Sequence, residues 1–279
     1  MGSIYIKEGN LDEGEKYLLT VLDSYPDAEI ENELAVELMM EVYAKRNDLP
    51  GYYAWLDKRG IAVSEQQKDS TFWQPVQLAR DNGDCDLQIE KATYYLDNIS
   101  NPIKEISAHY YMATCYYTSG QKNEALYHYD FITTKPNNNY FTESLKYAGE
   151  ITFESENYKL ALGHFSTLEN VGVTQEDLSL SKRGQMYCFY YFDNFQSAII
   201  YAKKVLLLNH PNDKVVEDAN LFLANSYKEL GLLDSALISY ENVIATAKSE
   251  AAAEAKYNMC HICYFCLLYT SDAADDIPR

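Results

Sequence analysis

The sequence predicts an all-α fold made of stacked antiparallel helix pairs. Apolar residues recur at helical spacing, as at Leu223, Ala224 and Tyr227, whereas the alternation typical of strands is absent at any useful length. One small or apolar position also recurs at a nearly constant interval of about 36–38 residues. The recurring residues are Gly14, Tyr52, Ile89, Ala125, Ala161, Ala198 and Ala236. A period of this length is typical of repeat proteins, in which each unit stacks only on its neighbours.

Each complete unit is expected to contain a first helix, a short turn and a second helix. The clearest unit has a helix over residues 107–120, a turn at Gly120 and a second helix over 121–129, before Pro136. A similar unit runs from Asn220 through Gly231 to Tyr240. We expect the turns between the two helices of a unit at Gly9-Asn10, Asn47 to Pro50, Gly83-Asp84, Gly120, Glu156-Asn157, Asp193-Asn194 and Gly231. Pro26, Pro102, Pro136 and Pro211 separate one unit from the next.

The two ends of the chain are expected to hold incomplete units. The first unit has its second helix over residues 11–24, preceded by the last turn of a first helix. Residues 250–266 are expected to be the first helix of an eighth unit that lacks its second helix. We therefore expect a repeat array over 1–266 that is truncated at both ends, followed by a non-native tail over 267–279.

The units resemble the tetratricopeptide repeat (TPR), whose pattern places small residues where paired helices cross and aromatic residues between them. The small residues are Ala113, Gly149 and Ala224 on first helices and Ala125, Ala161 and Ala236 on second helices. The aromatic residues are Tyr116, Tyr129, Phe165, Tyr227 and Tyr240. The match is strongest over 106–246, because Tyr52 and Ile89 replace the small residue in earlier units. The resemblance implies a right-handed α-solenoid with units of about 36–38 residues, as in long bacterial multi-repeat TPR proteins. It favours the bacterial cell envelope or periplasm only weakly.

Composition excludes two classes of partner. The 279 residues include 42 Asp and Glu but only 23 Lys and Arg, for a net charge of −19. Nucleic-acid binding requires an excess of cations, so we expect no nucleic-acid partner. The longest apolar run, Ile262 to Tyr269, is far shorter than the ~18 residues of a membrane helix, so we expect no direct membrane insertion.

No residue pattern favours catalysis, a cofactor or a metal. Cys260, Cys263 and Cys266 have the spacing of a cluster motif, but a fourth ligand is lacking, and we expect them to be packed apolar side chains. Glu150, Glu154 and Glu156 crowd one helix end, where a solvated acidic face is the simpler interpretation. His128 and His164 are expected to be packed or solvated. We therefore expect that the protein is not an enzyme.

The resemblance implies that some first-helix residues line a concave groove. The candidate peptide-binding residues are Tyr110, Thr114, Tyr117, Lys146, Tyr147, Glu150, Phe153, Arg183, Tyr187, Tyr190, Tyr191, Asn225 and Lys228, with Leu221 beside them. Tyr and Arg are the residue types that dominate binding hot spots, although an aromatic stripe at helical spacing is also typical of a core. The expected function is a non-catalytic protein–protein interaction scaffold that binds an extended peptide or a partner helix. The alternative is a sensor or regulatory region of a larger signalling protein.

Overall fold

The computed structural model describes residues 1–208, 213–246 and 250–275, with the backbone alone from residue 265 onward. The described residues form helices and turns and contain no strand, so the predicted all-α class of stacked helix pairs is confirmed. His210 and Pro211 lie outside the described residues. The chain divides into two compact units, residues 1–108 and 109–279, which are considered separately below.

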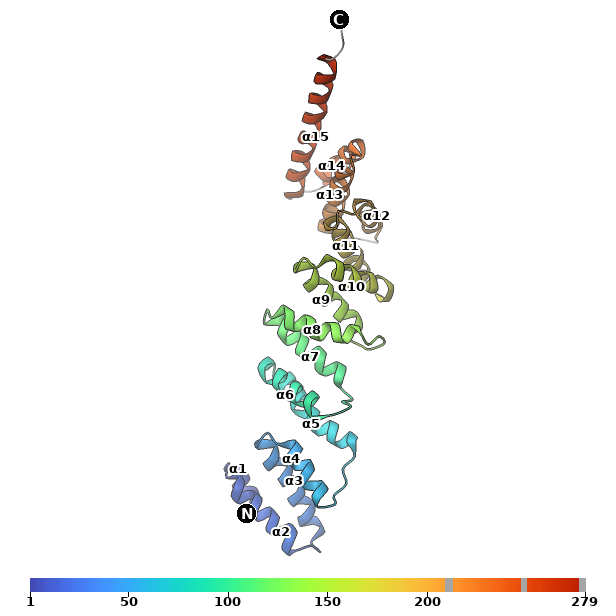
Figure 1. The fold of residues 1–279 in the computed structure, drawn as a ribbon. Coiled ribbons are helices and arrows are strands. Elements are labelled where there is room, and N and C mark those ends of the chain that lie inside the picture. The colour runs from blue at the N-terminus through green and yellow to red at the C-terminus, as the bar shows by residue number, and fades with distance from the viewer. Residues whose placement is uncertain (209–212, 247–249, 276–279) are drawn as a thin grey trace. The chain divides into compact units, whose positions relative to one another are not determined.

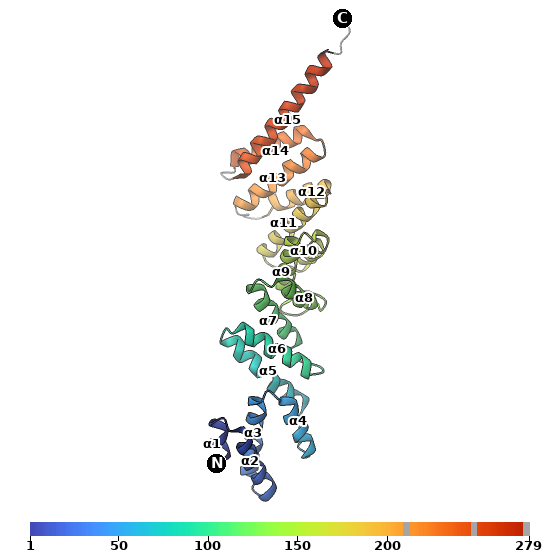
Figure 2. The same ribbon diagram turned by 60° about the vertical axis from the view of Figure 1, so that its left-hand side comes forward.

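The first unit contains six helices and the first residues of a seventh. The helices α1 to α4 pack against one another in chain order, and α5 packs against α6, which runs beside it in the opposite direction (Figures 1 and 2). The helices are α1 (Gly2–Lys7), α2 (Leu11–Ser24), α3 (Glu29–Lys45), α4 (Leu49–Lys58), α5 (Glu65–Asp81) and α6 (Cys85–Asn98). The predicted second helix over residues 11–24 corresponds to α2.

The second unit continues the same alternation of first and second helices. The helices are α7 (Glu105–Thr118), α8 (Lys122–Thr133), α9 (Phe141–Glu154), α10 (Tyr158–Val171), α11 (Gln175–Tyr191), α12 (Phe195–Leu206), α13 (Asp213–Glu229), α14 (Leu233–Thr246) and α15 (Glu250–Asp275). First helices of successive pairs also contact each other, namely α9 with α11 and α11 with α13. These contacts place the first helices α9, α11 and α13 next to one another within this unit (Figure 1).

The turn within each pair has the same backbone geometry throughout the chain. The residue two positions after the first helix has a positive φ of 56–82°, in the left-handed region. It is Gly9, Asn47, Gly83, Gly120, Glu156, Asp193 or Gly231. The next residue donates its N–H to the carbonyl five residues earlier, as Gln121 does to Tyr116 at 2.8 Å. This bond closes a Schellman motif, and Asn10, Asp48, Asp84, Asn157 and Asn194 also cap the following helix with their side chains. All seven predicted turns are therefore confirmed.

In one repeat, the turn geometry assigns the recurring position to a residue next to the one that the sequence alignment assigned. The left-handed residues are separated by 38, 36, 37, 36, 37 and 38 positions, and the recurring residue lies five positions after each. In α6 that residue is Gln88, which is 5% exposed, whereas Ile89 is half-buried. The sequence alignment assigned this position to Ile89, but the turn at Gly83 and the cap at Asp84 determine the register.

Small residues on paired helices leave room for the aromatic side chains of the core. Ala125, Ala161 and Ala236 are fully buried, as are Tyr129 and Tyr240, each four residues after the alanine. A Cβ atom built on Gly149 would lie 2.8 Å from Cε1 of Phe165, so the backbone of α9 contacts this ring directly. Many tyrosines therefore occupy the core of a helix pair, as the repeat pattern predicts.

Where Tyr52 replaces the small residue in the first unit, the pair is packed with aromatic rings. Tyr52 is 6% exposed, and its ring lies 5.3–6.0 Å from those of Tyr43, Tyr53 and Trp55. The bulky residue is therefore accommodated within the core of this pair.

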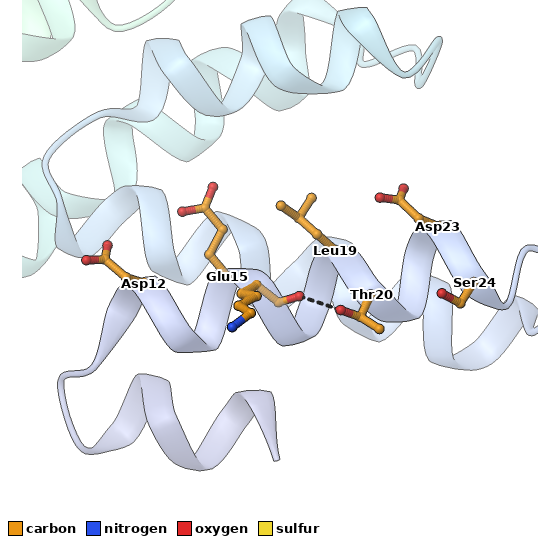
Figure 3. A pocket seen from close by; sticks show the side chains of 7 residues that line it. Asp12, Glu15, Leu19, Thr20, Asp23 and Ser24 are labelled. Atoms are coloured by element: carbon orange, nitrogen blue, oxygen red, sulfur yellow. Dashed lines mark hydrogen bonds between the residues drawn. The ribbon is translucent and has the colours of Figure 1, made fainter.

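A shallow acidic hollow lies along α2 in the first unit. Figure 3 shows Glu15, Leu19 and Asp23 projecting from the same side of this helix. Arg46 donates hydrogen bonds to the carboxylates of Asp12 and Glu15, each at 2.6 Å, and Arg59 pairs with Asp23 at 2.7 Å. Arginines from the ends of α3 and α4 therefore neutralise these three carboxylates.

The last helix differs from the sequence prediction in its cysteines. Cys260 and Cys263 are exposed, while Ala255 and Ile262 are buried against the preceding pair. The expectation of packed cysteines is thus wrong for these two, because the helix presents Ile262 to the preceding pair and turns its neighbours outward. The Cys266 side chain lies outside the described residues, and α15 continues past the predicted helix end to Asp275.

Candidate peptide-binding face of the first helices

The candidate groove residues occupy equivalent positions on the first helices of the second unit. Helices α7, α9, α11 and α13 end at Thr118, Glu154, Tyr191 and Glu229. Most candidates lie eight, four or one residues before these ends, as Tyr110, Thr114 and Tyr117 do in α7. Tyr147 and Tyr191 are candidates outside these three positions. The repeat register thus places them on one helix face.

At the α7–α9 end of this face, aromatic rings pack against one another. Tyr147 lies over Tyr129 of α8, with centroids 5.2 Å apart and rings nearly parallel, and Tyr117 lies 4.7 Å from Tyr147. Tyr110 stacks on Tyr140 at 4.1 Å. Tyr129 is fully buried and the other tyrosines are half-buried, so together they contribute to both the core and the surface, and their rings close the space between the two helices.

Between α9 and α11 the equivalent space is open. Gly184 lies seven residues before the end of α11, in the position that Tyr147 has in α9. A Cβ atom on Gly184 would lie 2.5 Å from Cδ2 of Phe165, so the backbone of α11 packs directly on this ring. Beside this contact lies a cavity of about 320 Å³, a size typical of the smaller ligand sites. Its lining comprises Glu150, Phe153, Glu154, Phe165, Leu180, Arg183, Gly184 and Tyr187.

The cavity presents an unpaired carboxyl group and an unpaired guanidinium among apolar walls. Within the described part of the chain, neither Glu150 nor Arg183 makes a hydrogen bond or an ion pair. Burial raises the pKa of the Glu150 carboxyl above its ordinary value, with a further contribution from the charge of Glu154. The nearby Arg183 charge acts in the opposite direction. Glu154 itself pairs with Lys122 of α8.

Tyr187 forms the wall of the cavity nearest to α13. Its hydroxyl donates a hydrogen bond to Oδ2 of Asp218 at 3.0 Å, and its ring lies 4.8 Å from that of Phe222. Burial and then the Asp218 charge raise the pKa of Tyr187 well above its ordinary value. Tyr190 makes an edge contact with Phe222 at 4.9 Å, and Tyr191 is 49% exposed. The hydrogen bond and ring contacts fix the orientation of this wall.

Other candidate residues are engaged within the fold. Asn225 is only 8% exposed, accepts the Tyr240 hydroxyl at 2.5 Å and donates to Glu254 at 3.1 Å. Lys228 donates to Asn258 at 3.2 Å. These contacts join α13 to α14 and α15, so the register alone does not make a candidate residue available to a ligand.

Two further candidates are also held by contacts within the protein. Lys146 pairs with the buried carboxylate of Asp177, and the Thr114 hydroxyl donates to the Tyr111 carbonyl at 2.9 Å. The structure therefore brings Glu150, Phe153, Arg183 and Tyr187 together around the cavity.

Glu154, Phe165, Leu180 and Gly184 line the cavity but are not among the groove residues expected from sequence. The signal for Gly184 was present, because this first-helix position holds a tyrosine at 147 and a phenylalanine at 222. A glycine at a position that is aromatic in the preceding and following repeats indicates that a large side chain is missing there. The effect of this loss depends on the ring that the glycine faces.

The histidines of the second unit are packed, as one of the two predicted alternatives stated. His128 and His164 are 7% and 8% exposed. Nδ1 of His128 lies 2.8 Å from Nδ1 of His109, and the His128 ring stacks on Tyr116. In the described part of the chain, no three His, Cys, Asp or Glu residues converge as metal ligands would. Among the described helices, none is both long and apolar enough to cross a membrane.

Repeated helix pairs joined by a constant turn define an α-helical repeat protein. A family model described as "Tetratricopeptide repeat" matches residues 1–27. The crystal structure of the MamA protein has a TM-score of 0.50 at 13% identity, and the match covers 67% of this chain and 96% of MamA. BtubC from P. vanneervenii has a TM-score of 0.45 at 10% identity, covering 69% of this chain and 93% of BtubC. No curated protein matches the sequence.

The fold is that of a multi-repeat tetratricopeptide protein. At 13% identity the likeness to MamA shows the fold alone. The tetratricopeptide fold is in general a scaffold for protein–protein interaction and is in general non-catalytic.

Proposed function

We propose that this protein is a non-catalytic scaffold whose first-helix face in the second unit binds an extended peptide or a helix of a partner protein. The observation on which this proposal depends is the cavity at Gly184, which adjoins the two unpaired charges of Glu150 and Arg183. Extended concave surfaces are the usual binding surfaces of repeat proteins.

The chemistry of the cavity specifies the peptide that it would accept. Phe153, Leu180 and Phe165 form apolar walls suited to one bulky aliphatic or aromatic side chain. The guanidinium of Arg183 can bind a carboxylate with two parallel hydrogen bonds. The carboxyl group of Glu150 can accept a hydrogen bond from a peptide N–H or a side-chain donor. The expected ligand therefore has an apolar anchor next to an acidic residue.

The proposal is tested by selecting binders from a random peptide library displayed on phage, with the full chain as the target. Affinities of the enriched peptides are then compared for the wild type and for Glu150→Gln and Arg183→Gln. Both substitutions remove a charge; Glu150→Gln keeps the shape of the side chain, whereas Arg183→Gln also shortens it. We expect each to weaken binding about tenfold, since a hydrogen bond to a charged group contributes roughly 1.5–3 kcal/mol.

Lys159→Gln is the matched control, because Lys159 is exposed on a second helix and does not line the cavity. Thermal unfolding of each variant separates a binding effect from loss of the fold. The proposed site would be contradicted if the enriched peptides bound Glu150→Gln and Arg183→Gln as tightly as they bind the wild type and the control.

A further inference from the structure

The first unit has an apolar groove of its own between α3 and α5. It measures about 420 Å³, and its apolar lining comes from Met40, Leu49, Pro75 and Leu78. The Leu78 side chain is 64% exposed. Leu78 thus extends the apolar lining of the groove to the surface of the protein.

Pro75 gives this groove a hydrogen-bond acceptor. It lies inside α5, and proline has no N–H to donate to the carbonyl four residues earlier. That carbonyl belongs to Thr71, which also lines the groove. The Thr71 carbonyl therefore lacks its regular helical partner and can accept a hydrogen bond from a ligand.

The α3 side of the groove is acidic. Glu33 and Glu37 lie seven and three residues before Met40, on the same helix face. Both are exposed, and neither makes an ion pair within the described residues. The cations at the end of α3 are already engaged, because Lys45 pairs with Glu41 at 2.9 Å and Arg46 with Asp12 and Glu15. The groove thus combines an apolar lining with a carbonyl that lacks its regular helical donor, and two carboxylates without ion pairs lie beside it on α3.

We propose that this groove binds a basic amphipathic helix of a partner protein. Apolar residues of that helix would cover Met40 and Leu78, and Lys or Arg residues beside them would face Glu33, Glu37 and the Thr71 carbonyl. The mode is helix-in-groove, since polyproline-type grooves are lined by aromatic residues and this lining contains none. This site lies entirely in the first unit, so it is independent of the cavity at Gly184.

The test uses a synthetic 14-residue peptide of Leu and Lys, with the leucines at helical spacing, labelled for fluorescence anisotropy. Binding is measured to the full chain at 0.15 M salt, where long-range attraction is screened. We expect Leu78→Ser to weaken binding at least fivefold and Glu37→Gln to weaken it about threefold. Ile238→Ser is the matched control, because Ile238 is 61% exposed on a helix of the second unit. It should bind the peptide as the wild type does.

Pro75→Ala provides a readout that a purely structural role would not give. Alanine restores the N–H that bonds the Thr71 carbonyl, so the melting temperature should rise while peptide affinity falls. A peptide with Glu in place of Lys should not bind. The proposal is overturned if the Leu/Glu peptide binds equally well, or if Leu78→Ser and Ile238→Ser have the same affinity for the Leu/Lys peptide.

Discussion

At the scale of single residues, a buried histidine pair links the stability of the fold to pH. His109 is 8% exposed and His128 is 7% exposed, and their Nδ1 atoms are 2.8 Å apart. A hydrogen bond between two such nitrogens requires one of them to be unprotonated, so at most one ring of the pair can carry a charge. Burial lowers the pKa of His128 to about 4.

The sign of the resulting pH dependence follows from this shift. The ordinary histidine pKa is 6.5, so the unfolded chain takes up a proton at a higher pH than the folded chain does. The stabilisation from neutral His128 is complete above pH 6.5 and is lost as the pH falls toward 4. Asp130 acts in the opposite direction, because burial raises the pKa of its carboxyl group.

We expect His128→Phe to reduce the loss of stability between pH 7 and pH 5. Phenylalanine keeps a ring against Tyr116 but takes up no proton. The free energy of unfolding is measured by urea denaturation at both pH values, and the difference is compared with the wild type. His261→Gln is the control, since His261 is exposed. Identical pH differences for His128→Phe and the wild type would show that His128 does not titrate in this way.

At the scale of helices, the crossing of α9 with α10 depends on glycine at one position and not at another. A Cβ atom on Gly149 would lie 2.8 Å from the Phe165 ring, whereas one on Gly163 of α10 has nothing within 4 Å. Of these two positions, only Gly149 is required for close helix approach.

We expect Gly149→Ala to destabilise the protein by about 1–3 kcal/mol through overpacking. Gly163→Ala should stabilise it by roughly 0.5–1 kcal/mol, because alanine is the better helix former and meets open space. Urea denaturation of both variants measures the two effects. Free-energy changes of the same sign would mean that the α9–α10 contact is not the one described.

The helices and their turns could be predicted from sequence because their causes are local. Gly120 and Asn157, for example, terminate or cap helices through contacts within a few residues. The cavity could not be predicted, because it depends on the ring that lies opposite Gly184. The burial of Asn225 depends in the same way on Tyr240, fifteen residues away. Position in the repeat predicted which face a residue lies on, but not whether it is free to bind.

At the scale of the whole molecule, the fold predicts that a destabilising substitution affects mainly the helices near it. In repeat proteins each helix pair contacts only its neighbours, so stability is roughly a sum over repeats and their interfaces. Met39 in the first unit and Val243 in the second are both fully buried. The two positions therefore allow each unit to be destabilised separately.

We expect Met39→Ala to reduce hydrogen-exchange protection mainly in α1 to α4, since it removes about 2–5 kcal/mol of core packing. Val243→Ala should reduce protection mainly in α13 to α15. Amide exchange by mass spectrometry on the full chain measures both patterns. An even loss of protection along the chain in either variant would indicate a single cooperative unit.

The constant turn within each pair also determines where the chain can change length. The left-handed residue always follows the first helix by two positions, and the second helix begins two positions later. The small variation in repeat length therefore comes from the segments outside this turn. A short inserted peptide, such as an epitope tag, should accordingly be tolerated in a segment between two helix pairs, for example at residues 135–139. The same insertion should disrupt the protein when placed between Gly120 and Gln121, where the end of one helix and the start of the next share a single short turn.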